Sequence, residues 1–303
     1  MTGAKMKILN FGSLNIDYVY KLDHFVKKGE TIASYSLNRY SGGKGLNQSV
    51  ALGKAGLEIY HAGSIGKDGT FLLDVLKSSG VDVSLVSILE NESTGHAIIQ
   101  NDKEGDNCII LYGGANQSIT EKQVDEVLGN FSSGDYLILQ NEINCMDQII
   151  KKAYERGMEI VLNPSPMNEK ITALDLKKIS WFILNEIECG QITGMETEDA
   201  DILTDAMLKK FPDSRIVLTL GSEGSCYADK TRKVRQGIYK VKTVDTTAAG
   251  DTFSGYFIAG ITGGKSVEES MDLAAKASAI AVSRPGAAPS VPTMREVESF
   301  RNQ

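Results

Sequence analysis

The regular alternation of strand-like and helix-like segments after residue 120 constrains the fold of this chain most strongly. Apolar runs at 136–139, 159–162, 181–184 and 216–220 have the length of buried strands, and the segments between them carry apolar residues at helical spacing. Strands that are connected by helices in this way form right-handed βαβ units. The pattern therefore predicts an α/β fold with a mainly parallel central sheet that helices cover on both faces.

Composition and charge narrow the classes of protein. Hydrophobic residues make up 42% of the 303 residues and charged residues 23%, which is ordinary for a globular chain. Because no linker or low-complexity tract interrupts the pattern, we expect residues 1–303 to form one domain. The net charge of −7 argues against a general nucleic-acid or anionic-membrane surface.

The cysteines and histidines do not form a metal or disulfide pattern. The 4 cysteines lie far apart without a Cys-x-x-Cys pair, and the 3 histidines do not form His-x-x-x-His, so a zinc site or disulfide framework is not expected. The N-terminal apolar run is too short for a signal peptide, and no stretch is long enough to span a bilayer. We expect a cytoplasmic protein.

Two regions, at about 15–40 and 94–112, are predicted to form a small β appendage. Strand-like segments at 95–101 and 107–112 are joined by a polar turn, which is typical of a hairpin. We expect this hairpin to pair with the strand-like region 31–40, apart from the main core.

The stretch 244–255 carries the most informative pattern for function. It follows a strand-like segment at 239–244 and precedes a helical one at 252–261, with small residues at the turn between them. A helix that begins there points unpaired backbone N–H groups at a bound anion such as phosphate. Asp251, in the first turn, is a candidate base for a hydroxyl proton in phosphoryl transfer. The alternative is that Asp251 only caps the helix.

A glycine-rich turn, Gly42-Gly43-Lys44-Gly45, precedes a second helical segment. A phosphate loop requires Ser or Thr after the Lys, and Gly45 stands there; the dinucleotide fingerprint is also missing, which argues against an oxidoreductase. We expect the glycines to let the backbone approach a small polar ligand, with Lys44 and Asn47 as donors. The alternative is a flexible turn.

Two further motifs follow predicted strands. Asn185 and Glu188, three residues apart, could orient the water shell of Mg²⁺, although a helix cap and a solvated Glu explain them as well. Gly221 and Gly224 lie just beyond the strand at 216–220, where open parallel sheets bind ligands.

Taken together, these stretches resemble the ribokinase family of sugar kinases over nearly the whole chain. The strings that carry the resemblance are Gly12-Ser13-Leu14-Asn15-Ile16-Asp17, Gly42-Gly43-Lys44-Gly45-Leu46-Asn47-Gln48, Asn163-Pro164-Ser165-Pro166, Asn185-Glu186-Ile187-Glu188, Leu220-Gly221-Ser222-Glu223-Gly224, Asp245-Thr246-Thr247-Ala248-Ala249-Gly250-Asp251-Thr252-Phe253 and Gly286-Ala287-Ala288-Pro289-Ser290-Val291-Pro292. The resemblance implies a three-layer α/β/α sandwich with a small β-sheet lid built from the appendage.

The resemblance also implies roles for individual residues. The sugar would be held by Asn15, Asp17, Gly42, Gly43, Lys44, Asn47 and Glu142. Asp251 would be the base, and the amides of Ala248, Ala249 and Gly250 would form the anion hole. ATP and Mg²⁺ would be held by Asn185, Glu188, Thr219, Gly221, Gly224 and Lys276.

A monovalent cation site and a dimer are implied as well. The resemblance places K⁺ among Asp245, Thr247, Ala281, Arg284, Gly286 and Ser290. The carbonyls of a turn whose amides face a phosphate point the other way, and such an ion would satisfy them. The alternatives are that Asp245 only caps its own turn, or that a Lys side chain or a water replaces the ion. The lid would form the contact of a homodimer.

The function that the resemblance implies is ATP-dependent phosphorylation of D-ribose at its 5-hydroxyl. Leu46 and His96 depart from the family pattern and could reshape the sugar pocket. Deoxyribose, another sugar or a nucleoside therefore remain open as acceptors. A non-catalytic sugar-binding regulator is a further alternative, although it would have no use for Asp251.

Overall fold

A nine-stranded sheet forms the centre of the computed structural model, which describes residues 6–301. Its strands are β1 (Ile8–Phe11), β4 (Ile59–Gly66), β5 (Val81–Leu89), β8 (Tyr136–Gln140), β9 (Glu159–Asn163), β10 (Trp181–Asn185), β11 (Arg215–Thr219), β12 (Ser225–Ala228) and β13 (Lys233–Gln236). Their order is β13-β12-β11-β10-β9-β8-β1-β4-β5. Pairing is parallel from β11 to β5, while β12 runs antiparallel to both of its neighbours.

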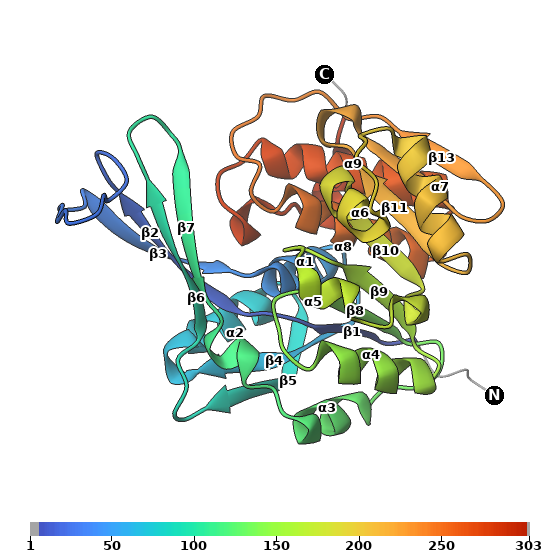
Figure 1. Cartoon of the computed structure of the whole chain (residues 1–303), viewed down its shortest axis with the longest axis horizontal. Coiled ribbons are helices and arrows are strands. Elements are labelled where there is room, and N and C mark those ends of the chain that lie inside the picture. The colour runs from blue at the N-terminus through green and yellow to red at the C-terminus, as the bar shows by residue number, and fades with distance from the viewer. Residues whose placement is uncertain (1–5, 302–303) are drawn as a thin grey trace.

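Helices cover both faces of this sheet (Figure 1). One face carries α1 (Lys44–Lys54), α2 (Thr70–Ser78), α8 (Ala249–Thr262), α9 (Val267–Val282) and α10 (Met294–Ser299). The other face carries α3 (Glu121–Leu128), α4 (Met146–Glu155), α5 (Glu169–Thr172), α6 (Glu186–Thr193) and α7 (Ala200–Lys210). Short 3-10 helices occur at Lys67–Gly69, Gly114–Gln117, Leu176–Lys178, Gly221–Glu223 and Ala288–Ser290.

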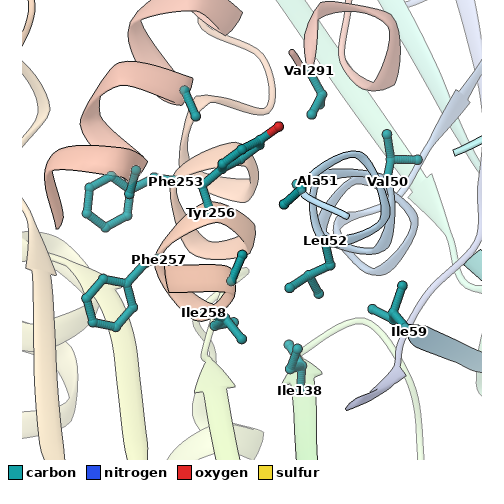
Figure 2. Close-up of a cluster of buried hydrophobic side chains, with 14 of the residues drawn as sticks. Val50, Ala51, Leu52, Ile59, Ile138, Phe253, Tyr256, Phe257, Ile258 and Val291 are labelled. Atoms are coloured by element: carbon teal, nitrogen blue, oxygen red, sulfur yellow. The ribbon is translucent and has the colours of Figure 1, made fainter. Parts of the chain in front are cut away.

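Successive residues of the parallel strands point alternately into two separate hydrophobic cores. In β8, Ile138 belongs to the core under α1 and α8, whereas Leu137 and Leu139 belong to the core under α3 and α4. Successive side chains of a strand point to opposite faces, so a strand buried on both faces is apolar throughout. Figure 2 shows part of the first core, where Ala51 of α1 faces α8.

A separate four-stranded sheet stands to one side of the main sheet (Figure 1). It consists of β2 (Asn15–Lys21), β3 (Ser36–Gly42), β6 (Gly95–Asn101) and β7 (Asn107–Tyr112), in the order β3-β2-β6-β7. We call these four strands the lid. The predicted sandwich with a mainly parallel sheet and a small second sheet is therefore confirmed.

Three details of the predicted elements are wrong. The hairpin of β6 and β7 pairs with β2 and not with the 31–40 region, in which a strand begins only at Ser36. The segment 239–244 is not a strand, and Tyr239, Lys240, Val241 and Thr243 line a cavity beside the sheet. The strands β5, β12 and β13 were not expected.

Candidate active site

The site lies where the carboxyl ends of five parallel strands meet. The residues at or just beyond the ends of β1, β8, β9, β10 and β11 are Ser13, Glu142, Asn163, Asn185 and Thr219. From β1 the strand order continues through β4 and β5 on one side, and from β8 it continues through β9, β10 and β11 on the other. This switch point between β1 and β8 leaves a crevice at the carboxyl edge of an open sheet. Sequence motifs far apart in the chain are thereby brought to one place.

Asp251 occupies the first turn of α8 at the bottom of this crevice and is only 7% exposed. The helix follows Ala248, which adopts the left-handed conformation with φ of 61°. Ala248, Ala249, Gly250 and Asp251 line a cavity of about 210 Å³. The amide of Ala249 donates to the carbonyl of Thr246 at 3.1 Å, so this member of the predicted anion hole is engaged within the turn.

Two side-chain amides of α1 hold the carboxylate of Asp251. Asn47 Nδ2 lies 3.1 Å from Oδ2 of Asp251, and Gln48 Nε2 lies 3.0 Å from Oδ1. One turn further along each helix, a Cβ atom on Gly255 would overlap the Cβ atom of Ala51. The absence of a side chain at Gly255 therefore lets α1 approach α8 closely enough for these bonds.

A pair of acidic side chains, Asp17 of the lid and Glu142 after β8, lies at the glycine-rich turn that opens α1. Burial, reinforced by the neighbouring charge of Glu142, raises the pKa of Asp17 to about 6. Burial also raises the pKa of Glu142, which accepts hydrogen bonds from the Ser13 hydroxyl and, at 2.9 Å, from the Lys44 amide. A Cβ atom at Gly42 would overlap the Asp17 carboxylate, so the glycine makes room for it.

Two more of the predicted sugar-binding residues border this pair. Gly43 has φ of 92°, the left-handed backbone that glycine tolerates best, and it directly precedes α1. Asn15 begins β2, and its Oδ1 accepts a hydrogen bond of 2.7 Å from Asn116 Nδ2. Asn116 also pairs with the backbone of Leu14, so it fixes the start of the lid strand.

A larger cavity of about 630 Å³ opens beside Gly250. Of the residues predicted for the nucleotide, Thr219, Gly221 and Gly224 line it. Lys276 is not among the lining residues; its ammonium group pairs with Asp272 at 2.7 Å and lies 5.7 Å from the ring centroid of Tyr239, which does line the cavity. Residues that we did not predict complete the cavity wall, among them Ile238, Tyr239, Lys240, Val241, Phe253, Ala279 and Val282.

Asn185 and Glu188 line the smaller cavity together with Asp251 and Lys44. They also form a capping box at the start of α6: the Glu188 amide donates to Asn185 Oδ1 at 2.8 Å, and the Asn185 amide donates to Glu188 Oε2 at 3.0 Å. The expected cap is thus present, and the same two residues line the smaller cavity. The box takes one of the two carboxylate oxygens of Glu188, a group whose hard oxygen atoms suit Mg²⁺ and its water shell.

The carboxylate of Asp245 joins the two segments that were predicted to hold a cation. Its Oδ1 accepts from the Thr247 amide at 2.8 Å and its Oδ2 from the Gly286 amide at 2.9 Å. These bonds oppose the effect of burial and lower the pKa of Asp245, which therefore keeps its negative charge. Among the other predicted ligands, the side chain of Arg284 pairs with Glu296 at 2.7 Å, and the carbonyl of Ala281 accepts from the Arg284 amide. The hydroxyl of Ser290 donates to the Ala287 carbonyl at 2.7 Å.

The two departures from the family pattern lie at different places in the fold. His96 is in register with Ile16, so it lies on the face of the lid opposite to Asn15 and Asp17, and its ring packs against Tyr112 at 5.0 Å. The suggestion that His96 reshapes the sugar pocket is therefore wrong. Leu46 is fully buried in the first hydrophobic core.

Sequence reasoning missed Gln48 and Asn116 as parts of the site. Gln48 directly follows the predicted Asn47, but only the packing of two helices 200 residues apart shows that both amides reach Asp251. Asn116 lies in a short 3-10 helix without any motif of its own.

Comparisons with known proteins identify the family of this chain. Residues 5–294 match the model of the family described as pfkB family carbohydrate kinase, and the chain belongs to this family. The chain is 33% identical to a ribokinase of Haemophilus influenzae, with 95% of this chain and 96% of that protein covered.

Solved structures of ribokinases are also similar to this chain. The structure of Arabidopsis thaliana ribokinase with ribose and ATP has a TM-score of 0.87 and 29% identity and covers 98% of this chain and 100% of that chain. The ADP complex of Cryptococcus neoformans ribokinase has a TM-score of 0.83 and 32% identity, and covers 97% of this chain and 99% of that chain. Among residues 6–301, no helix combines the length and apolar character that a membrane span requires.

Proposed function

We propose that this chain transfers the γ-phosphate of ATP to the 5-hydroxyl of D-ribose and so produces ribose 5-phosphate. The observation that carries the proposal is the position of Asp251, which lies at the start of α8 between the acidic pair and the cavity of about 630 Å³. A base at this point faces a hydroxyl on one side and a phosphate on the other. Relatives named as ribokinases, including one solved with ribose and ATP, support the choice of sugar.

In the proposed reaction, the Asp251 carboxylate accepts the proton of the sugar hydroxyl. The hydroxyl oxygen forms a bond to the γ-phosphorus, and the bond from that phosphorus to the β–γ bridging oxygen breaks, so ADP leaves with the electron pair. The N-terminus of α8 offers its dipole and amides, foremost those of Ala248 and Gly250, to the negative charge on the transferred group.

The sugar would be bound by Asn15, Asp17, Gly42, Gly43, Lys44, Asn47 and Glu142, because carboxylates, amides and exposed backbone together match a ring of hydroxyl groups. The nucleotide would occupy the larger cavity along Thr219, Gly221 and Gly224, while Lys276 lies outside its lining. Asn185 and Glu188 would hold the water shell of Mg²⁺, which supplies charge neutralisation on the phosphates when it is bound.

We further propose a monovalent cation, K⁺, at the joint between Asp245 and Gly286, and a homodimer through the lid. The charged Asp245 carboxylate supports the first, and the exposed apolar residues of β7 support the second. A cytoplasmic location fits the free cysteines Cys108, Cys145, Cys189 and Cys226.

The decisive experiment substitutes Asp251→Asn, which keeps the size of the side chain and removes the base. We expect turnover of ribose to fall by about 10²–10⁴-fold while ribose and ATP still bind. The measurement is a coupled ADP assay, with calorimetry for binding. A variant within threefold of the unsubstituted enzyme would place the base elsewhere.

The same assay, run with a panel of pentoses, hexoses and nucleosides, distinguishes the acceptors. Ribose should give the highest kcat/KM, whereas a higher value for a nucleoside would correct the substrate. Release of no ADP with any acceptor would instead favour a sugar-binding regulator.

A further inference from the structure

We propose that Gln48 is a positioning residue for Asp251, and that Gln140 and Asn10 fix the direction in which its side-chain amide points. The inference rests on the proposed function only in taking Asp251 as the base. It concerns residues that neither bind the sugar in the proposal above nor line either of the two cavities at the crevice.

A continuous chain of hydrogen bonds runs from Asp251 into the core. Gln48 Nε2 donates to Asp251 Oδ1 at 3.0 Å, and Gln140 Nε2 donates to Gln48 Oε1 at 2.6 Å and to Asn10 Oδ1 at 3.1 Å. Asn10 Nδ2 in turn donates to the hydroxyl of Ser49 at 2.9 Å. All of these residues except Asp251 are at most 1% exposed, so water does not compete for the bonds.

Asp251, the first member, determines which groups donate and which accept along this chain of hydrogen bonds. A carboxylate only accepts hydrogen bonds, so Gln48 must turn its NH₂ group toward Asp251 and its oxygen toward Gln140. Gln140 must then present its own NH₂ group, whose two hydrogens reach Gln48 and Asn10. Inverting the amide of Gln48 would place its oxygen against the Asp251 carboxylate and its NH₂ group against that of Gln140. Both contacts are repulsive, so one orientation is retained.

The far end of the chain is also fixed. The Ser49 hydroxyl accepts from Asn10 and lies 2.7 Å from Nδ1 of the fully buried His61. Burial lowers the pKa of His61 to about 3, so the ring is neutral at pH 7 and can accept the Ser49 hydroxyl proton at Nδ1. Asn10 Nδ2 donates in addition to the carbonyl of Gly45, at 2.8 Å. The chain is thus anchored on β4 and on the turn that opens α1.

This arrangement has a consequence for the base. Asp251 must keep one oxygen aimed at the sugar hydroxyl, and a carboxylate free to rotate would lose part of the benefit of orientation. Asn47 holds Oδ2 and Gln48 holds Oδ1, so the plane of the carboxylate is defined from both sides. Asn47 also belongs to the proposed sugar site. Gln48 is therefore the hydrogen-bond partner of Asp251 that does not bind the sugar.

The first test is Gln48→Met, which preserves length and removes both the donor and the acceptor. We expect kcat for ribose to fall about 10–100-fold, with KM for ribose and ATP within about threefold, because orientation and not binding is lost. Gln123→Met is the matched control: Gln123 is hydrogen-bonded to Ser64 and the Gly63 carbonyl, and it lies on α3, on the face of the main sheet opposite to α1 and α8. The control should leave kcat unchanged.

The second test is Gln48→Glu, which keeps the shape but offers a carboxylate to Asp251. The charged groups around this pair are Glu142 after β8, and Lys44 and Glu188 around the cavity. The neutral amides that contact it are Asn47, Gln140 and Asn163. Two adjacent carboxylates share a proton, so the acidic limb of the kcat profile should move to higher pH by one unit or more. At pH 8 the Glu variant should be more active, relative to the unsubstituted enzyme, than at pH 6.

The third test addresses the second member of the chain. Gln140→Met should lower kcat in the unsubstituted enzyme but add no further loss in the Gln48→Met background, because it acts through Gln48. Additive losses would overturn the relay. An unchanged kcat in Gln48→Met, or an unmoved pH profile in Gln48→Glu, would overturn the role of Gln48.

Failure of this inference can be distinguished from failure of the proposed function. An unsubstituted enzyme without sugar kinase activity, or an Asp251→Asn variant with full activity, contradicts the proposed function. A crystal structure of Gln48→Met tests the positioning without any assay, since an Asp251 carboxylate with unchanged orientation and order overturns the inference. If Gln48→Met does not fold, the nearly isosteric Glu variant supplies the same structure and the pH profile.

Discussion

Asp17 lies in the lid strand β2, where burial and the neighbouring Glu142 raise the pKa of its carboxyl group to about 6. Between the ordinary value of 3.8 and about 6, the folded protein keeps a proton that the unfolded chain has lost. The contribution of this group to stability therefore falls as pH rises through that window, and the loss persists at neutral pH. Burying this carboxylate lowers the stability of the free protein. The same carboxylate can accept hydrogen bonds from the hydroxyl groups of a sugar.

We predict that Asp17→Asn stabilises the free protein while it weakens sugar binding. Removing the penalty should raise the free energy of unfolding at pH 7 by about 1–3 kcal/mol, and the gain should vanish near pH 4. The KM for ribose should rise by at least tenfold, since a carboxylate bond to a hydroxyl is worth about 1.5–3 kcal/mol. Urea unfolding at both pH values, with steady-state kinetics, checks the two parts.

The same pKa predicts a pH effect in the unsubstituted enzyme. As pH falls from 7 to 5, Asp17 becomes protonated and KM for ribose should rise. In Asp17→Asn this dependence should flatten, and a KM that rises equally in both proteins would assign the effect to another group.

At the scale of elements, the contact between α1 and α8 decides the geometry of the base. Gly255 lies against Ala51 in this contact, one turn from the bonds between Asp251 and the two amides. We predict that Gly255→Ala costs about 1–3 kcal/mol of stability by overpacking, although alanine favours a helix. It should also lower kcat about tenfold, because the helices move apart.

The control for this prediction exchanges the two small residues. In Ala51→Gly/Gly255→Ala the methyl group moves from α1 to α8, so most of the stability and activity should return. Thermal unfolding and kcat of the single and double variants test this. If the double variant is no better than Gly255→Ala, the methyl overlap is not the cause.

The turn that precedes α8 carries the prediction for a monovalent cation. Because Asp245 cross-links this turn to Gly286, an ion that satisfies nearby carbonyls would stiffen the start of α8. Titrating K⁺ into Tris buffer at constant Mg²⁺ and ATP should raise turnover several-fold, and Na⁺ should do less. Asp245→Ala should abolish the response. A rate that is indifferent to K⁺ in depleted buffer would contradict the cation site.

Elements with strong local signals were predicted well, and those that depend on partners were not. Strands β8 to β11 lie within about one residue of the expected ranges. By contrast, β2 lies between β3 and β6, and no local pattern shows which strand a hairpin joins. The segment 239–244 alternates like a strand but lines a cavity instead.

The candidate site shows the same division. Asp251 and the glycine-rich turn stand in recognisable strings, whereas Gln140 and Asn10 are ordinary polar residues whose role depends on burial beside one another. Lys276 was expected near the nucleotide, but its ammonium group forms an ion pair with Asp272, one helical turn away. Competition of this kind is decided only in the folded chain.

At the scale of the whole molecule, the lid predicts a dimer. All six residues of β7 are exposed, and among them Ile109, Ile110, Leu111 and Tyr112 are each more than half exposed. Contiguous apolar surface of this kind marks an interface. We expect light scattering to give twice the mass of 32.8 kDa. Ile109→Lys/Ile110→Lys should shift the protein to monomer, while the control Tyr154→Lys, on α4, should not.

The β13 edge of the large sheet and the β7 edge of the lid should differ in how readily they add further strands in a crowded solution. At β13, Lys233 and Arg235 project charge that pairs with Asp201, and charged side chains discourage further strand addition. At β7, the backbone edge carries an uncharged, mainly apolar run from Cys108 to Tyr112. An uncovered strand of this composition is a template for aggregation. Oligomerisation through this edge would thus also cover the strand and protect solubility.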